Sequence, residues 1–172
     1  MPDQSSVQTF HFERLANVVA LPIGRWDADA RLLFCNTPYL AWAGRSHEQL
    51  LGRTLDELFG NDAWAAAQPA FERAFGGKTA SYQRLLTHPP HPQRWARVQV
   101  FPDVDEHGVV TSVFTIATDI HQDIVERDAL IAARKRLDRF TDNIPTPLVY
   151  LDVECRLRFV NRAWREMVGD AS

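Results

Sequence analysis

A segment near the start of the chain recurs 125 residues later. Over the 23 positions of Pro22–Gly44, seven residues are identical to those of Pro147–Gly169. The identical pairs are Pro22/Pro147, Asp27/Asp152, Arg31/Arg156, Leu32/Leu157, Phe34/Phe159, Asn36/Asn161 and Gly44/Gly169. Self-similarity at a fixed period indicates a structural unit used twice. We therefore expect one complete domain, a connector and the truncated opening of a second domain, in a fragment of a longer tandem-domain protein.

The first copy predicts a strand hairpin, several short helices and three further strands. The strands of the hairpin are residues 22–26 and 31–36, joined by a tight acidic turn. The helices are expected at 37–44, 46–52, 54–59 and 63–75, with a capping box at Ser46–Gln49 and glycines at the helix ends. The later strands are expected at 79–87, 94–101 and 109–120. This order predicts an α+β fold built on an antiparallel sheet.

The flanking segments complete the expected organisation. Residues 5–16 have apolar side chains at helical spacing, and 121–140 lacks internal glycine and proline. We expect a lead segment at 1–11, a domain at 12–120, a linker helix at 121–141 and the truncated second copy at 142–172. In the second copy we expect a hairpin followed by the start of a helix, either frayed or in contact with a neighbour.

The linker helix has two sets of apolar residues that differ in phase. Leu130, Ala133, Leu137 and Phe140 follow the 3-4-3 spacing of a coiled-coil seam, whereas Ile124 and Ile131 lie out of phase with them. We predict a parallel homodimer through this helix and the N-terminal helix. The alternative is a single helix that packs on its own domain.

Composition excludes several classes of protein. Nineteen basic and 22 acidic residues give a net charge of −3, so we expect no nucleic-acid partner. Two cysteines are too few for a disulfide framework or a cysteine-based zinc site. No signal peptide or apolar run of membrane-spanning length is visible. The sequence therefore favours a cytoplasmic location.

Several motifs, in this order and spacing, resemble the PAS domain family from about Phe12 to Ile120. Asn36 closes the second strand as the family asparagine does. The segments Gly52–Leu58 and Asp105–Gly108 resemble the family's helix motif and its last turn, and Thr118–Ile120 resembles the Asp-Ile-Thr end of its last strand. The fourth strand is matched by Trp95, Val98 and Pro102. His121 departs from the family, which usually has threonine there.

The resemblance implies a five-stranded antiparallel sheet in spatial order 2-1-5-4-3, with short helices on one face and a long linker helix after it. It also implies a sensory module of a bacterial signalling protein, upstream of a histidine kinase, diguanylate cyclase, phosphodiesterase or transcriptional regulator. The chain itself is then not an enzyme. The residues expected to relay the signal are Asp119, Ile120, Ile124, Ile131 and Leu137.

Two other functions remain open. One is a ligand-free PAS domain that only dimerises. The other is a small α+β enzyme of the ketosteroid-isomerase type, which needs an Asp or Tyr in an apolar pocket. Its candidates Asp103, Asp105 and Asp119 lie at strand ends, and the repeat argues against it.

The sequence disfavours haem and covalently bound flavin and names no other cofactor. Haem-binding relatives place an axial histidine in the stretch 55–75, which contains none here, and flavin-binding relatives need a cysteine on the same helix. No spacing of His, Cys, Asp or Glu predicts a metal site.

The remaining hypothesis is a small apolar ligand in a cavity between sheet and helices. Large apolar side chains with few polar groups suit such a ligand, although the same residues also suit a filled core. The polar candidates at the cavity mouth are Asn36 and Arg97. The candidate lining residues are Trp42, Phe59, Trp64, Phe71, Phe75, Trp95, Val98, Val100, Val113 and Thr115.

Overall fold

The computed structural model describes residues 14–87 and 93–169. The described residues form two compact units, divided between His121 and Gln122. The first unit opens with a helical turn at residues 14–18, so most of the predicted helix at 5–16 lies outside the described residues. Its named elements are β1 (Ile23–Trp26), β2 (Leu32–Cys35), α2 (Thr37–Ala43), α3 (His47–Leu50), α4 (Leu55–Phe59), α5 (Asn61–Phe75), β3 (Ala80–Leu86), β4 (Arg94–Val104) and β5 (Val110–Asp119).

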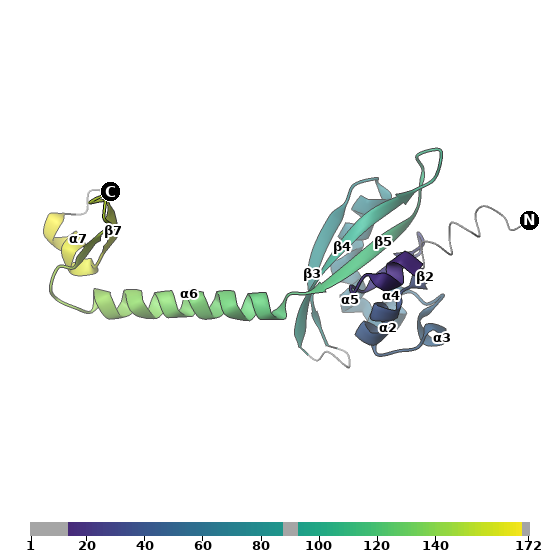
Figure 1. Ribbon diagram of the computed structural model, residues 1–172, viewed down its shortest axis with the longest axis horizontal. Helices are drawn as coiled ribbons and strands as arrows, with labels where there is room; N and C mark the ends of the chain where they lie inside the picture. The colour runs from purple at the N-terminus through teal and green to yellow at the C-terminus, as the bar shows by residue number, and fades with distance from the viewer. Residues whose placement is uncertain (1–13, 88–92, 170–172) are drawn as a thin grey trace, which may run out of the picture. The chain divides into compact units, whose positions relative to one another are not determined.

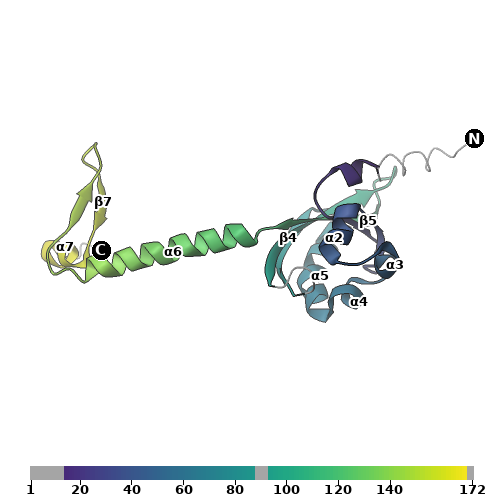
Figure 2. The same cartoon turned by 60° about the horizontal axis from the view of Figure 1, so that its bottom comes forward.

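The five strands form one sheet in the order β2-β1-β5-β4-β3, and every neighbouring pair is antiparallel. The helices α2 to α5 lie on one face of this sheet (Figures 1 and 2). The predicted fold class and strand order are therefore confirmed. β1 and β5 are central strands, so residues from both ends of the first unit meet in the middle of the sheet.

Local signals position the helices as the sequence predicts, with one shift. The side chains of Gln49 and Glu57 accept hydrogen bonds from the backbone N–H groups of Ser46 and Thr54, at 3.0 Å each, which closes the two capping boxes. Helix α5 begins at Asn61, two residues before the predicted start. Gly60 causes the shift, because its positive φ of 88° turns the chain directly from α4 into α5.

The core lies between the sheet and the helices. Trp26 is 1% exposed and makes edge-to-face contacts with Tyr39 and Phe71, at centroid distances of 6.5 and 6.0 Å. The indole N–H of Trp26 donates to Thr115 Oγ1 at 2.9 Å. A Cβ on neighbouring Gly24 would come within 3.0 Å of that nitrogen and 3.1 Å of that oxygen. Glycine therefore allows the close approach of β1 and β5 under Trp26.

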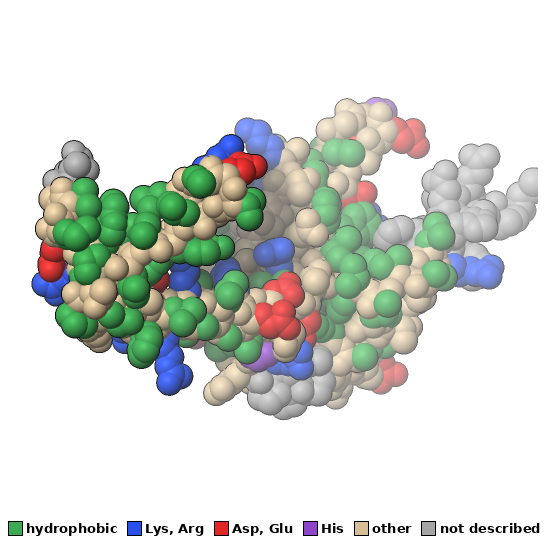
Figure 3. Space-filling view, turned by 60° about the vertical axis from the view of Figure 1, so that its left-hand side comes forward, with side chains coloured by type: hydrophobic (Ala, Val, Ile, Leu, Met, Phe, Trp, Pro, Cys, Tyr) green, Lys and Arg blue, Asp and Glu red, His purple; other side chains and the backbone are tan. Residues whose placement is uncertain are grey.

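The second unit has the predicted hairpin and helix. It comprises α6 (His121–Asp142) from Gln122 onward, β6 (Val149–Leu151), β7 (Leu157–Val160) and α7 (Arg162–Val168), with β6 and β7 antiparallel. All residues of α6 are described, and none of them is buried. Hydrophobic side chains spread over the surface of this unit (Figure 3), and they include Leu130, Leu137, Phe140, Tyr150, Leu157 and Met167.

None of the helices in the described part of the chain has the length and apolar character needed to cross a membrane.

Candidate functional site

An inner chamber of about 30 Å³ lies between the sheet and helices α2 and α4. Its volume is close to that of a single water molecule. Polar groups from three elements reach it, namely Tyr39 of α2, Tyr82 and Arg84 of β3, and Thr115 of β5. The remaining lining residues are Trp26, Trp42, Leu55, Phe59, Leu86, Val98 and Ala117. The chamber is thus a small aromatic space with a few convergent polar groups, as in ligand pockets.

An outer groove of about 480 Å³ lies beside the chamber, between β3 and the junction of α4 with α5. Phe59 and Arg84 line both spaces, so the two side chains separate the chamber from the groove. The other groove residues are Gly60, Asn61, Asp62, Ala63, Ala66, Gln83, Leu85, Thr87 and Trp95. This volume lies within the range of about 300–1,000 Å³ that is typical of small-molecule pockets, whereas the volume of the chamber lies far below it.

Burial changes the protonation chemistry of the chamber tyrosines. Desolvation raises the pKa of Tyr82 to about 12 and raises the pKa of Tyr39 further, while the charge of Arg84 opposes both shifts. Both hydroxyls are therefore neutral at physiological pH. The Tyr39 side chain is buried, at only 6% exposed. The chamber is thus lined by two neutral phenol groups.

The structure brings only some of the predicted cavity residues together. Trp42, Phe59, Val98 and Thr115 line the chamber, and Phe59 and Trp95 line the groove. Five others line neither space. Phe71, Val100 and Val113 are fully buried in the core, and Trp64 and Phe75 pack against it. These five residues therefore belong to the packed core or to its edge, as expected if the large apolar side chains fill the core and do not line a cavity.

The two polar residues predicted at the cavity mouth lie elsewhere. Asn36 is completely buried and lines neither space. Its Oδ1 accepts from the backbone N–H groups of Ile23 and Tyr39, and its Nδ2 donates to the carbonyls of Ala16 and Leu21. Arg97 is exposed, because the inward positions of β4 are Ala96, Val98 and Val100. The alternation of side chains along β4 directs Arg97 away from the chamber. Asn36 is buried because its side chain caps the N-terminus of α2.

Three chamber residues escaped the sequence prediction, namely Tyr39, Tyr82 and Arg84. The signal for two of them is the alternation of β3, in which Tyr82, Arg84 and the fully buried Leu86 point to the same face. An arginine on an edge strand is usually exposed, so its inward position was missed.

The predicted relay residues lie at the end of β5 and along α6. Asp119 ends β5, pairs with Arg94 at 2.7 Å and accepts from the backbone N–H of His121 at 2.9 Å. Ile120 is 3% exposed and donates its N–H to the Trp95 carbonyl at 3.0 Å. These contacts hold Ile120 and His121, the last residues of the first unit, against the ends of β4 and β5. Ile124 is half-buried, whereas Ile131 and Leu137 are exposed along α6.

His121, the departure from the family motif, leaves a polar atom without a partner. Its Nδ1 is buried and forms no hydrogen bond within the described part of the chain, and the same holds for Nε of Arg94. The hydroxyl of the family's threonine is absent at this junction, and the Asp119 side chain accepts a hydrogen bond from the backbone N–H of His121.

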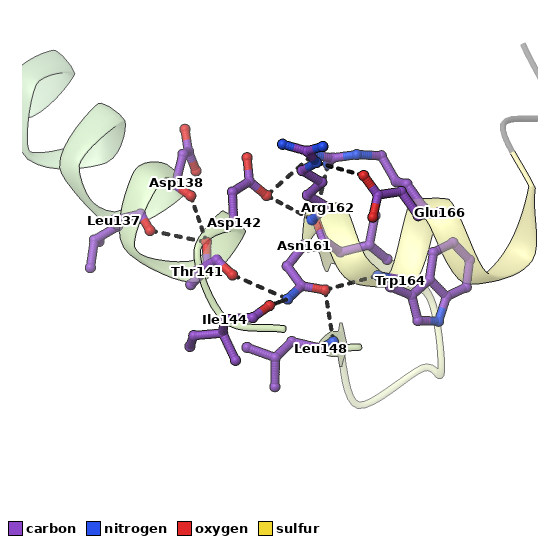
Figure 4. Close-up of polar contacts among 12 residues, drawn as sticks. Leu137, Asp138, Thr141, Asp142, Ile144, Leu148, Asn161, Arg162, Trp164 and Glu166 are labelled. Atoms are coloured by element: carbon purple, nitrogen blue, oxygen red, sulfur yellow. Dashed lines mark hydrogen bonds and ion pairs between the residues drawn. The ribbon is translucent and has the colours of Figure 1, made fainter. Parts of the chain in front are cut away.

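The far end of α6 is bonded to the second hairpin through Asn161 (Figure 4). Asn161 is fully buried, and its Nδ2 donates to the carbonyls of Thr141, Ile144 and Thr146. Asp142 Oδ1 accepts from the backbone N–H of Arg162 at 2.7 Å. The last turn of the linker helix is therefore also the opening segment of the second copy.

No group of three or more His, Cys, Asp or Glu side chains in residues 14–87 and 93–169 is arranged as a metal site.

Comparisons with known proteins agree with this architecture. The sequence profile described as "PAS fold" matches residues 17–123, and the profile described as "PAS domain" matches residues 135–172. No curated protein sequence matches the chain.

Solved structures share the fold at low sequence identity. The PAS domain of Bordetella pertussis BvgS superposes with a TM-score of 0.56 and 21% identity, over 76% of this chain and 98% of that one. An RNA-binding light-oxygen-voltage receptor superposes with a TM-score of 0.63 and 18% sequence identity, over 83% of this chain and 41% of the receptor. Vibrio cholerae VqmA bound to DPO superposes with a TM-score of 0.54 and 18% sequence identity, over 66% of this chain and 57% of that one.

The "PAS fold" profile covers 107 of the 172 residues, and it spans the five-stranded sheet, the helices on its face and the chamber between them. The second profile falls on the hairpin and helix that repeat the opening of the first unit. The chain belongs to the PAS domain family.

Proposed function

We propose that the chain is a sensory PAS module that binds a small molecule at the chamber and groove of its first unit and relays this event through α6. The observation that carries the proposal is that one strand, β5, connects the chamber to the start of α6. Thr115 and Ala117 of β5 line the chamber, and β5 ends at Asp119, which accepts a hydrogen bond from the backbone N–H of His121, the first residue of α6. A ligand that displaces β5 or its neighbours acts directly on the contacts of Asp119 and Ile120.

The second unit supports a relay role for α6. The hydrogen bonds of Asn161 and Asp142 tie the last turn of the helix to the following hairpin and to α7. A rotation or shift of α6 is therefore passed to the second copy and is not absorbed by a flexible joint. We place the output beyond the sensing module, in a kinase, cyclase, phosphodiesterase or transcriptional regulator of the cytoplasm, and we assign no catalytic step to this chain.

Dimerisation through α6 is part of this proposal. Leu130, Leu137 and Phe140 are 71, 64 and 68% exposed, and with Ala133 they form one stripe at 3-4-3 spacing. Large apolar residues in a continuous stripe on an exposed helix favour burial against a second helix. A parallel pair of helices would carry the signal from two sensing units together.

A binding experiment on the whole chain tests the sensing role. Native mass spectrometry of the purified protein, repeated under denaturing conditions, detects a bound molecule as mass that is lost on denaturation. Ala117→Phe fills the chamber from β5 and should abolish that extra mass, whereas Ile116→Phe, on the other face of the same strand, should retain it. Equal occupancy in both folded variants would contradict binding at this site.

One observation favours a second function, ligand-free dimerisation. The chamber holds about one water molecule, so the first unit is already well packed without a ligand. A dimer that copurifies with no small molecule and binds none in the experiments below would favour this alternative.

A further inference from the structure

Two arginines approach the same aromatic ring at the boundary between chamber and groove. The guanidinium carbon of Arg84 lies 4.7 Å from the centroid of Phe59, and that of Arg45 lies 6.0 Å from it. Both distances are within the range of cation–π attraction. Arg84 comes from β3 and Arg45 from the turn after α2, so two separate segments bring positive charge to one place.

These two charges have no anionic partner within residues 14–87 and 93–169. Among the described residues, neither Arg45 nor Arg84 forms an ion pair, whereas Arg25 and Arg94 of the same unit pair with Asp103 and Asp119, each at 2.7 Å. Like charges at one ring repel each other, and the attraction of the ring offsets only part of that cost. The pair of guanidinium groups therefore favours binding of an anion from solution.

Neutral donors lie beside the two cations. Arg84 and Tyr82 both affect the titration of Tyr39, so the three polar heads share one electrostatic environment in the chamber. The Tyr39 side chain is only 6% exposed and lines the chamber together with Tyr82 and Arg84. A guanidinium group with phenol O–H donors in an aromatic setting matches the geometry of a carboxylate, which accepts several hydrogen bonds at once.

The groove sets the size and character of the rest of the molecule. The chamber is too small for more than a few atoms, whereas the groove, which Arg84 also lines, offers about 480 Å³ beside Phe59, Leu85 and Trp95. Asp62 stands exposed on the groove wall and disfavours a second negative charge. We infer that the site recognises a small organic monocarboxylate, with its carboxylate at Arg84, its apolar body in the groove, and the nearby charge of Arg45 adding to the attraction.

This inference rests on the proposed sensing function and names the ligand class of the same site. Three matched pairs of an acid and its neutral amide test it on the whole chain, namely benzoate and benzamide, hexanoate and hexanamide, and indole-3-acetate and indole-3-acetamide. Binding is measured by isothermal titration calorimetry and by chemical-shift changes of the tryptophan indole N–H groups. We expect at least one acid to bind about tenfold or more tightly than its amide, since a charge-assisted pair is lost in the amide.

Variants locate the effect. Arg84→Gln should remove the preference for the acid, and Arg84→Lys, which retains the charge, should keep part of it. Arg97→Gln removes an exposed arginine from the other face of the sheet and should leave the preference unchanged. Circular dichroism spectra that match the parent chain establish that each variant is folded.

The outcomes separate the two claims. Equal binding of acids and amides, or an acid preference that survives Arg84→Gln, would overturn the carboxylate inference and leave the sensing function standing. If none of the six compounds binds but native mass spectrometry finds a neutral molecule, the inference is likewise overturned and sensing stands. If no compound binds and no molecule copurifies, both claims fail.

Discussion

Asn161 makes in the second unit the same hydrogen bonds that Asn36 makes in the first, shifted by 125 residues. Oδ1 of Asn36 accepts from Ile23 N at 2.9 Å, and Oδ1 of Asn161 accepts from Leu148 N at 2.8 Å. Each side chain also caps the helix that follows it and bonds to the end of the helical segment before it. The repeat therefore preserves a structural node, in which one buried amide joins a lead helix, a hairpin and the next helix.

Asn36→Ala should destabilise the first unit by about 3 kcal/mol, because four backbone groups lose their partner in a fully buried place. Urea unfolding followed by tryptophan fluorescence measures this change, because Trp26, Trp42, Trp64 and Trp95 all lie in the first unit. Asn161→Ala is the matched control. It should leave that transition within about 0.5 kcal/mol, since Asn161 bonds only residues of the second unit. A loss in both variants would mean that the two units unfold together.

The repeat also explains why so much of the fold could be predicted from the sequence. Turn, cap and strand signals within Pro22–Gly44 are local, and each depends on residues a few positions apart. The Asp27 turn forms as expected, with the Asp27 carboxylate accepting from Asp29 N and Arg31 N, and Asp152 forms the equivalent turn. Local chemistry of this kind is visible without knowledge of the sheet.

The composition of the candidate site was harder to predict. Val98 and Val100 both face inward on β4, yet only Val98 reaches the chamber, because its position relative to α4 and α5 depends on packing of the whole unit. Arg84 faces inward although arginines are seldom buried, and only the buried Leu86 two residues later fixes the face. The period-2 pattern of a strand therefore predicts which side chains face inward. It does not predict which of those side chains line a cavity and which fill the core.

Asp119→Ala should loosen the start of the linker helix. The substitution removes the acceptor for the backbone N–H of His121 and the partner of Arg94, a loss of about 1–2 kcal/mol from the first turn of α6. Hydrogen exchange should rise in the peptide that covers the end of β5 and the first turn. Asp123→Ala, whose side chain caps no backbone group in the described part of the chain, should change that peptide much less. Equal exchange in both variants would contradict the role of Asp119.

The first unit should lose stability at alkaline pH. Burial raises the pKa of Cys35 to about 11 and that of Tyr82 to about 12, so the folded state binds these protons more tightly than the unfolded state. Stability is therefore unaffected below about pH 9 and falls as the pH rises from there through 11 and 12. The urea midpoint measured at pH 8 and at pH 10.5 checks this. Cys35→Ala in the same measurement should make the fall shallower, whereas Cys155→Ala, at an exposed position, should not.

The exposed stripe of α6 predicts which face forms a dimer. Leu130, Ala133, Leu137 and Phe140 share one face, while Ile124 and Ile131 lie in a different phase and are less exposed. Leu137→Glu should convert a dimer to a monomer, because a charge in a helix seam cannot reach water without separating the helices. Ile131→Glu places the same charge outside the stripe and should leave the dimer intact. Light scattering after size-exclusion chromatography at several protein concentrations measures both. Dissociation by Ile131→Glu alone would assign the seam to the other phase, and a parent chain that stays monomeric throughout would refute dimerisation through α6.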